Sequence, residues 1–266
     1  MNAILRYPGA KWSIASWVLS FFPQHHSYLE PFFGSGAVFF TKKRSNIETI
    51  NDLDGEVVNL FECIRRDPER LAREVYYTPY SREVYEKAYE QTSETDPYIW
   101  AARMLIRCNM GYGFRTNGYR VGWKNDISGR ERAYAAKAWT ELPEILVNAA
   151  ERLRGVQIEH RPAVEVIKRF NSPQVLVYCD PPYVLSTRGG KQYRCEMEDS
   201  DHLELLEVIK AHKGPVLISG YASELYDREL SGWHRETTET LDQLSRHKNE
   251  VLWMNFDPMG QRSLFE

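Results

Sequence analysis

The segment Asp180-Pro181-Pro182-Tyr183 places a carboxylate and an aromatic ring in a stretch that two prolines make stiff. Each proline removes a backbone N–H donor and fixes φ, so the loop holds both side chains in one arrangement. The apolar run 175–179 just before it is typical of a buried strand. Because open α/β sheets carry their active sites at the carboxyl ends of strands, the segment predicts a site that grips a flat ring. The alternative is a proline turn that merely ends a strand.

A second pattern of this kind lies near the amino terminus. Residues 27–30 predict a short strand, the stretch 31–36 is a glycine turn, and the apolar residues 37–40 predict a helix. Glycines in such a turn let a ligand approach the backbone. Asp52 ends the next predicted strand, where a carboxylate can accept hydrogen bonds from ribose hydroxyls. The turn lacks the patterns of phosphate-binding and dinucleotide-binding loops, so the pair indicates a nucleoside cofactor; a Gly-Ser-Gly alone is more often a plain turn.

The composition is that of a globular protein. With 266 residues, 42% hydrophobic and 27% charged, the chain can bury one sizeable core and carry an inserted lobe. No apolar stretch reaches the roughly 20 residues that span a bilayer, and residues 1–23 lack the layout of a secretory signal, so we expect a cytoplasmic protein. The four cysteines lie far apart without a C-x-x-C pair, which predicts reduced thiols and neither a disulfide framework nor a metal site.

The net charge of −3 conceals a strongly basic segment. Residues 103–137 hold eight basic side chains against two acidic ones, interleaved with aromatic and amide residues. This mixture suits phosphates and base edges together, although an ordinary solvated loop has the same composition. The candidate nucleic-acid contacts are Arg115, Asn117, Tyr119, Arg120, Lys124 and Arg130.

The hydrophobic pattern predicts an α/β fold with a mostly parallel sheet. Between residues 53 and 154 the pattern becomes helical, with a glycine-rich basic middle at 111–129, and we interpret this part as an inserted lobe. A helix is predicted at 201–211. The predicted strands are 27–30, 48–51, 156–159, 175–179, 216–219 and 251–256.

Four blocks in this order resemble the Dam-like, D12 class of N6-adenine-specific DNA methyltransferases. The blocks are Tyr7-Pro8-Gly9-Ala10-Lys11, Glu30-Pro31-Phe32-Phe33-Gly34-Ser35-Gly36, Asn51-Asp52 and Asp180-Pro181-Pro182-Tyr183. The resemblance implies a Rossmann-like sheet of seven strands with one reversed, which binds S-adenosyl-L-methionine, and methylation of adenine N6 in duplex DNA. It further implies a catalytic core of residues 1–56 and 155–266 and a target-recognition insertion of residues 57–154. The residues Asp257-Pro258-Met259-Gly260 predict that the chain leaves the last strand there, so we expect a flexible tail at 257–266.

The resemblance also implies roles for individual residues. Asp52 would bind the ribose hydroxyls of S-adenosylmethionine, and Asp180 its methionine amino group while facing the target base. Many relatives have an aspartate near the cofactor adenine where this chain has His160-Arg161-Pro162-Ala163. We therefore expect this chain to recognise the adenine edge of the cofactor in another way. The remaining cofactor contacts carried over are Tyr7, Lys11, Phe32, Gly34, Ser35 and Gly36. Without the resemblance, Lys11 would be interpreted as an exposed lysine.

Transfer to adenine N6 gives these residues a chemical purpose. The lone pair of N6 is delocalised into the ring, so acceptors such as the Asp180 carboxylate and the Pro181 carbonyl must draw its protons away. In-line transfer then depends on alignment and needs no metal and no covalent nucleophile. Since the amine is unreachable inside a duplex, the base must flip out, and Tyr183 offers a stacking surface next to the rigid Pro182.

Two other functions stay open at this stage. The enzyme could methylate another planar amine, such as cytosine N4 or an amide of RNA or protein, or the chain could be a sequence-specific DNA-binding protein without turnover. The carboxyl end, with Gln261, Leu264 and Phe265, resembles the short peptides that dock on the bacterial sliding clamp; a disordered apolar end is the alternative. A DNA-acting enzyme would be found with the nucleoid in the cytoplasm.

Overall fold

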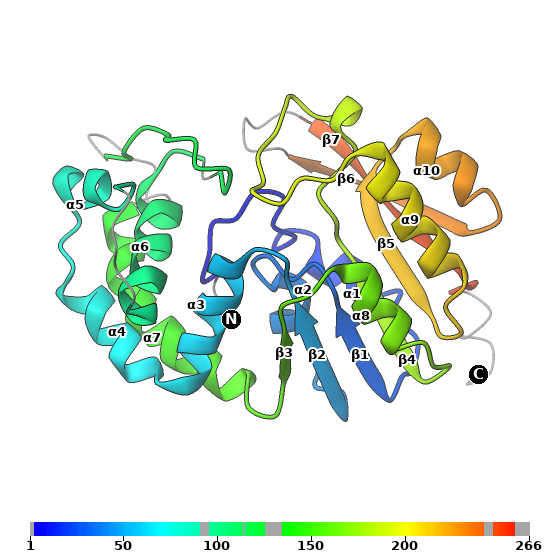
Figure 1. The fold of residues 1–266 in the computed structure, drawn as a ribbon, viewed down its shortest axis with the longest axis horizontal. Helices are drawn as coiled ribbons and strands as arrows, with labels where there is room; N and C mark the ends of the chain where they lie inside the picture. The colour runs from blue at the N-terminus through cyan, green and yellow to red at the C-terminus, as the bar shows by residue number, and fades with distance from the viewer. Residues whose placement is uncertain (1–2, 91–95, 114, 126–134, 242–246, 259–266) are drawn as a thin grey trace. The chain divides into compact units, whose positions relative to one another are not determined.

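The computed structural model describes residues 3–90, 96–113, 115–125, 135–241 and 247–258. The chain divides into two compact units (Figure 1). The first consists of Met1–Ala10, Asp54–Arg154 and Gln192–Arg194, and the second of Lys11–Leu53, Gly155–Lys191 and Cys195–Glu266. In the part of the chain that is described, no helix is long and apolar enough to cross a bilayer.

The second unit is built on a sheet of seven strands in the order β3-β2-β1-β4-β5-β7-β6. Strands β1 to β5 pair in parallel, while β7 runs antiparallel to both of its neighbours and is the reversed strand. The predicted fold class is therefore confirmed. The strands are β1 (Ser27–Glu30), β2 (Ile47–Asn51), β3 (Gln157–Glu159), β4 (Val175–Cys179), β5 (Val216–Tyr221), β6 (His234–Leu241) and β7 (His247–Met254).

The sequence pattern located the buried strands better than the edge strand. β1 and β4 have the predicted bounds, and both are fully buried. A last strand was predicted at 251–256 and is present as β7, but its predicted bounds were wrong, because β7 begins at His247 and ends at Met254. No strand was predicted at β6, whose sequence His-Arg-Glu-Thr-Thr-Glu-Thr-Leu lacks an apolar run. A strand at the sheet edge pairs on one side and can stay polar, so it leaves a weak hydrophobic signal.

Helices cover the sheet of the second unit on the face that α8 and α9 share. Val175, Val177 and Cys179 alternate along β4 toward a cluster that includes Leu205 of α9, and in Figure 1 both helices lie in front of the strands. The predicted helix 201–211 is α9, which starts earlier because Glu198 forms a capping box. The helices are α1 (Ala15–Leu19), α2 (Ala37–Thr41), α8 (Ala163–Arg169), α9 (Asp199–Lys210) and α10 (Glu224–Glu229), with a 3₁₀ turn at Leu185–Thr187.

The order of the strands places a topological switch between β1 and β4. From β1 the chain proceeds outward through β2 and β3, then returns to β4 on the other side of β1. Loops that leave β1 and β4 at their carboxyl ends therefore diverge, which is where open α/β sheets bind ligands. Both the glycine turn at 31–36 and the segment that begins at Asp180 leave the sheet at this position.

The first unit is helical. Its helices start at caps that the sequence encodes, since the carboxylates of Asp54, Asp67 and Asp96 accept hydrogen bonds from first-turn amides. Met1–Ala10, which we had expected in the catalytic core, belongs to this unit, and Asn109 donates to the Ile4 carbonyl at 3.4 Å. The helices are α3 (Gly55–Arg66), α4 (Pro68–Tyr77), α5 (Arg82–Lys87), α6 (Pro97–Met110) and α7 (Ala135–Arg152).

Candidate active site

Asp180 follows the last residue of β4, and a neighbouring strand fixes its carboxylate. Cys179 pairs with Ile218 of β5, so the next residue along β5, Ser219, lies beside Asp180. The Ser219 hydroxyl donates a hydrogen bond to Asp180 Oδ1 at 2.9 Å. The side chain of Asp180 keeps 19% of its surface accessible, so the carboxylate is oriented from behind and still open to a ligand.

Lys11 is buried against this carboxylate. Its Nζ lies 2.8 Å from Asp180 Oδ1 and 3.5 Å from Glu250 Oε1, and 4.8 Å from the centroid of the Tyr183 ring. The residue is 5% exposed. The alternative of an exposed surface lysine is therefore excluded, because burial of an ammonium requires carboxylate partners and the fold supplies two of them.

Tyr183 is held by three groups other than its own loop. Its hydroxyl donates to Glu250 Oε1, Lys11 lies over its ring, and Tyr221 of β5 meets it edge to face at 4.7 Å between centroids. Burial, with the carboxylates of Asp180 and Glu250 nearby, raises the pKa of Tyr183 well above its ordinary value. The phenol is therefore neutral at physiological pH and acts as a donor that fixes the orientation of the ring.

Glu250 is a charged site residue that the sequence did not predict, and the neutral partners Ser219 and Tyr221 were not predicted either. Glu250 lies on β7, paired with Tyr221 of β5, and is 3% exposed. Because β7 is antiparallel, its amino-terminal half lies at the same sheet edge as the carboxyl end of β4. Burial raises the pKa of Glu250, which Lys11 opposes by lowering it. An acidic residue directly before the apolar run 251–254 was the available signal, but the predicted strand began one residue later.

The glycine turn and Asp52 are also brought together in this unit. Gly34 and Gly36 have φ values of 48° and 65°, and the Gly34 amide donates to Asp52 Oδ2 at 2.8 Å. The Asn51 side chain ties the turn to the next strand, since its amide donates to the Pro31 and Arg161 carbonyls at 2.9 and 3.0 Å. Ser35 and Gly36 are buried and Phe32 half-buried.

The loop after Tyr183 is closed by a buried ion pair. Arg188 Nε donates to the Tyr183 carbonyl at 2.7 Å, and its guanidinium pairs with both carboxylate oxygens of Glu196. The two side chains are 7% and 10% exposed. A bidentate pair of this kind is directional, so it fixes the backbone on the carboxyl side of the Asp180–Tyr183 segment.

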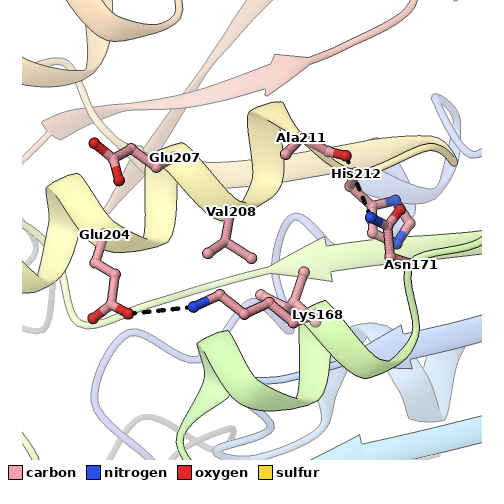
Figure 2. Close-up of a pocket in the computed structure, with 8 residues that line it drawn as sticks. Lys168, Asn171, Glu204, Glu207, Val208, Ala211 and His212 are labelled. Carbon is pink, nitrogen blue, oxygen red and sulfur yellow. Dashed lines mark hydrogen bonds and ion pairs between the residues drawn. The ribbon is translucent and has the colours of Figure 1, made fainter.

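A hollow elsewhere in this unit does not belong to the site. A cavity of about 260 Å³ lies between α8 and α9, as Figure 2 shows, with a Lys168–Glu204 ion pair of 3.6 Å at its rim. Asn171 and Ala211 precede β4 and β5, so this cavity is at the amino ends of the strands, opposite to Asp180. Within the described ranges, no group of three or more His, Cys, Asp or Glu side chains could hold a metal.

Comparisons with known proteins agree with this geometry. The model of the family "D12 class N6 adenine-specific DNA methyltransferase" matches residues 7–243. The chain belongs to this family. It is 25% identical to a DNA adenine methylase of Escherichia coli (strain K12), covering 84% of this chain and 82% of the relative. A DNA adenine methylase of Vibrio cholerae (O395) is 25% identical over 71% of this chain and 68% of the relative, and one of Salmonella typhi is 26% identical over 84% and 82%.

The first unit of this D12-class methyltransferase carries most of the basic segment. Backbone contacts join the two ends of the stretch 110–124 within this segment. Gly111 forms an antiparallel bridge with Trp123, and the Lys124 amide donates to the Met110 carbonyl at 2.7 Å. Tyrosines of the α5 region anchor the returning strand, with Tyr80 donating to the Lys124 carbonyl and Tyr85 to the Val121 carbonyl. The loop therefore rests on helices as a short antiparallel hairpin.

Lys124 lies at the base of this hairpin, and the candidate DNA contacts Arg115, Asn117, Tyr119 and Arg120 lie farther along it. Arg115 lies over the ring of Tyr119, with 4.9 Å from its guanidinium carbon to the ring centroid, and Tyr119 is 61% exposed. Arg120 pairs with Glu86 at 3.0 Å, and Asn117 accepts a hydrogen bond from the Tyr119 amide. Arg130 lies outside the described residues.

Tyr7 and the segment Gln192–Arg194 meet in the first unit. The rings of Tyr7 and Tyr193 lie 6.1 Å apart, and the Tyr193 hydroxyl donates to the Pro8 carbonyl at 3.1 Å. Tyr7 and Lys11 are thus assigned to different units although four positions separate them. The contact of Tyr7 with the cofactor stays a prediction.

A buried carboxylate holds Gln192–Arg194 on the helices of the first unit. Glu56 pairs with Arg107 at 2.7 Å and with Arg194 at 2.9 Å. Although burial opposes ionisation, these two guanidinium groups hold the pKa of Glu56 below its ordinary value. Thr116 joins the same segment to the hairpin, since its amide donates to the Gln192 carbonyl and its hydroxyl accepts from the Arg194 amide.

Proposed function

We propose that this D12-class methyltransferase transfers a methyl group from S-adenosylmethionine to adenine N6 in duplex DNA, by direct in-line transfer to a flipped base. The observation that supports the proposal most is the Asp180 carboxylate, which Ser219 holds at the switch point of the sheet. The fixed ring of Tyr183 follows it after two prolines. The similarity to proteins named DNA adenine methylase supports adenine in DNA as the substrate.

The second unit has acceptor groups that suit the ribose hydroxyls and the amino group of S-adenosylmethionine. Left-handed backbone at Gly34 and Gly36 allows a nucleoside to approach the turn, and the Gly34 amide orients the Asp52 carboxylate that would accept the ribose hydroxyls. Asp180 supplies an acceptor for the methionine ammonium. When bound, the cofactor supplies an electrophilic methyl group on a sulfonium. Phe32 and the buried Ser35 complete the wall of the proposed pocket.

Asp180 would activate the amine of the target base. Its carboxylate accepts a hydrogen bond from N6, with the Pro181 carbonyl as a second acceptor, and the nitrogen lone pair then points away from the ring. The N–C bond would form as the sulfonium C–S bond breaks, and Asp180 would accept the proton that N6 loses. Alignment provides most of the rate increase, as in other reactions that hold two reactants at near-contact distance.

Tyr183 would receive the flipped adenine. Extrusion from a duplex costs a few kcal/mol. Stacking on an aromatic side chain returns roughly 1–3 kcal/mol per base. Because Glu250, Lys11 and Tyr221 already fix the ring, little side-chain entropy is lost when the base arrives.

Duplex DNA would bind the hairpin of the first unit. Its side chains offer cations for phosphates together with an amide and an exposed ring for base edges. The backbone of Lys124 is held by hydrogen bonds at both its amide and its carbonyl, so its side chain starts from a fixed backbone position. The proposed contacts are Arg115, Asn117, Tyr119, Arg120 and Lys124, with Arg130 outside the described residues.

The decisive experiment uses purified protein, unmethylated duplex DNA and labelled S-adenosylmethionine, followed by mass analysis of the nucleosides. We expect N6-methyladenine with the wild type, its loss with Asp180→Asn, and wild-type activity with Asp199→Asn, an exposed aspartate of α9. Methylcytosine would reassign the reaction to cytosine N4. Transfer to RNA or protein in parallel reactions that contain them in place of DNA, or DNA binding without any transfer, would reject the proposal in favour of the other functions.

The proposed clamp peptide lies outside the described residues. Gln261, Leu264 and Phe265 stay a hypothesis that rests on their spacing alone. Deleting residues 261–266 should reduce binding to the host sliding clamp while leaving methyl transfer on short duplexes unchanged. Equal clamp binding by the shortened chain would refute it.

A further inference from the structure

One buried carboxylate, Glu250, and one partly exposed carboxylate, Asp180, share one ammonium beside the proposed methyl-transfer site. Lys11 Nζ lies between Asp180 Oδ1 at 2.8 Å and Glu250 Oε1 at 3.5 Å. The Lys11 and Glu250 side chains are 6% and 4% exposed. All three groups belong to the second unit, and they come from the loop after β4, from β7, and from the residues before α1.

The charges of this cluster are unequal. Two carboxylates face one ammonium, and like charges in a poorly solvated place repel strongly. The surrounding donors are neutral: the Ser219 hydroxyl reaches Asp180 and the Tyr183 hydroxyl reaches Glu250. The cluster therefore complements one additional cation, at the more accessible carboxylate, which is Asp180.

Asp180 alone cannot serve two ammonium groups equally well. In the ligand-free protein its Oδ1 already accepts from Ser219 and from Lys11. A cationic amino group arriving at Asp180 would meet the positive charge of Lys11 a few ångströms away. Glu250 offers Lys11 a second carboxylate. Lys11 Nζ lies 2.8 Å from Asp180 Oδ1 and 3.5 Å from Glu250 Oε1, so the two distances are similar. A small rotation of the Lys11 side chain exchanges its nearer partner.

We infer that Glu250 is a positioning residue that takes over Lys11 when the amino group of the cofactor binds Asp180. The inference rests on the proposed function and deepens it, because it assigns the second carboxylate of the site. The same oxygen, Glu250 Oε1, also accepts the Tyr183 hydroxyl. Lys11 and Tyr183, the ring proposed to stack on the target base, thus contact the same carboxylate oxygen of Glu250. Binding of the cofactor amino group therefore stabilises the position of the Tyr183 ring.

Calorimetric binding of two ligands separates this role from a general structural one. The first ligand is S-adenosylhomocysteine, which carries the amino group, and the second is its analogue without that amino group. We expect Glu250→Gln to weaken binding of S-adenosylhomocysteine by about tenfold, within the usual range of site couplings. Binding of the analogue should change less than twofold, since the analogue does not displace Lys11. Glu236→Gln, at a carboxylate on β6 that is 41% exposed, is the matched control and should change neither.

A double-mutant cycle tests the partner of Glu250. In the Lys11→Met background the cation that Glu250 receives is gone, so adding Glu250→Gln should have no further effect on the affinity for S-adenosylhomocysteine. If Glu250→Gln does not fold, Glu250→Asp replaces it in the same cycle, because the shortened side chain withdraws the carboxylate from Lys11.

Three outcomes overturn the inference. Equal affinity of the wild type and Glu250→Gln for S-adenosylhomocysteine excludes a role for Glu250 at the amino group. Equal weakening of both ligands, or additive effects in the cycle, would make Glu250 a purely structural residue. If the wild type binds neither ligand, the proposed function fails together with the inference, whereas the first two outcomes leave the proposed function standing.

Discussion

Gly36→Ala tests the backbone of the proposed cofactor turn, and the expected loss of stability follows from two separate terms. Gly36 precedes α2 with φ 65° and ψ 25°, a left-handed conformation. An L-residue there costs roughly 1–2 kcal/mol. A Cβ at this position would also lie 2.4 Å from Phe33 Cζ and 2.9 Å from Phe40 Cε2. Something must therefore move to admit the methyl group.

The aromatic neighbours have little room to move. Phe33 is 4% exposed and packs edge to face on Phe39 at 5.5 Å between centroids. Overpacking a close-packed core of this kind costs about 1–3 kcal/mol. Together the two terms give a destabilisation of roughly 2–5 kcal/mol for Gly36→Ala. Because the Phe33 amide donates to the Asn51 carbonyl at 2.9 Å, displacement of the ring should also weaken binding of S-adenosylhomocysteine.

Gly155→Ala is the matched control in the same unit. Gly155 also has a positive φ, 79°, but an added Cβ there meets nothing within 4 Å. It should lose only the backbone term, roughly 1–2 kcal/mol, and keep its affinity for the ligand. Urea unfolding of the wild type and both variants, followed by tryptophan fluorescence, measures the difference as a shift in midpoint at equal slope. Equal losses for the two variants would refute the steric argument, and only the cost of the left-handed backbone would remain.

Four further predictions concern other parts of the molecule. Arg188→Met should lower methyl transfer several-fold at unchanged affinity for S-adenosylhomocysteine, since it releases the backbone at Tyr183; parallel losses of both would contradict this role. Lys124→Ala should weaken duplex binding and reduce its salt slope by about 1, as measured by titration at several salt concentrations; an unchanged slope would place the DNA contacts elsewhere. Cys195, half-buried where the other three cysteines are buried, should be the one thiol that a disulfide reagent labels rapidly in the native protein, with all four labelled after unfolding. Burial raises the pKa of Glu250 above 4.5, so its contribution to stability is present below pH 4.5 and is lost as the pH rises through the raised pKa; Glu250→Gln should remove this part of the pH dependence in urea unfolding, and identical profiles would show that the carboxyl titrates normally.

The local features of the site could be predicted because their signals are local. A run of five apolar residues fixed the position of β4, and the prolines behind it placed Asp180 and Tyr183 at its carboxyl end. The glycines at 34 and 36 likewise marked a turn that needs left-handed backbone. Each of these signals depends on residues within one element, so it can be recognised without knowing which other elements pack against that element.

The partners of these residues could not be predicted, because they come from strands that the sequence does not order. Ser219 reaches Asp180 through the pairing of β4 with β5, and Glu250 reaches Lys11 and Tyr183 because β7 is inserted antiparallel next to β5. Nothing in the residues around Lys11 distinguishes a buried lysine from an exposed one. The sequence by itself determined the family, the glycine turn proposed to bind the cofactor, and the Asp180–Tyr183 loop. Tertiary structure decided which groups surround the Asp180 carboxylate, since burial and charge pairing depend on contacts between segments that lie far apart in the sequence, such as Lys11 and Ser219.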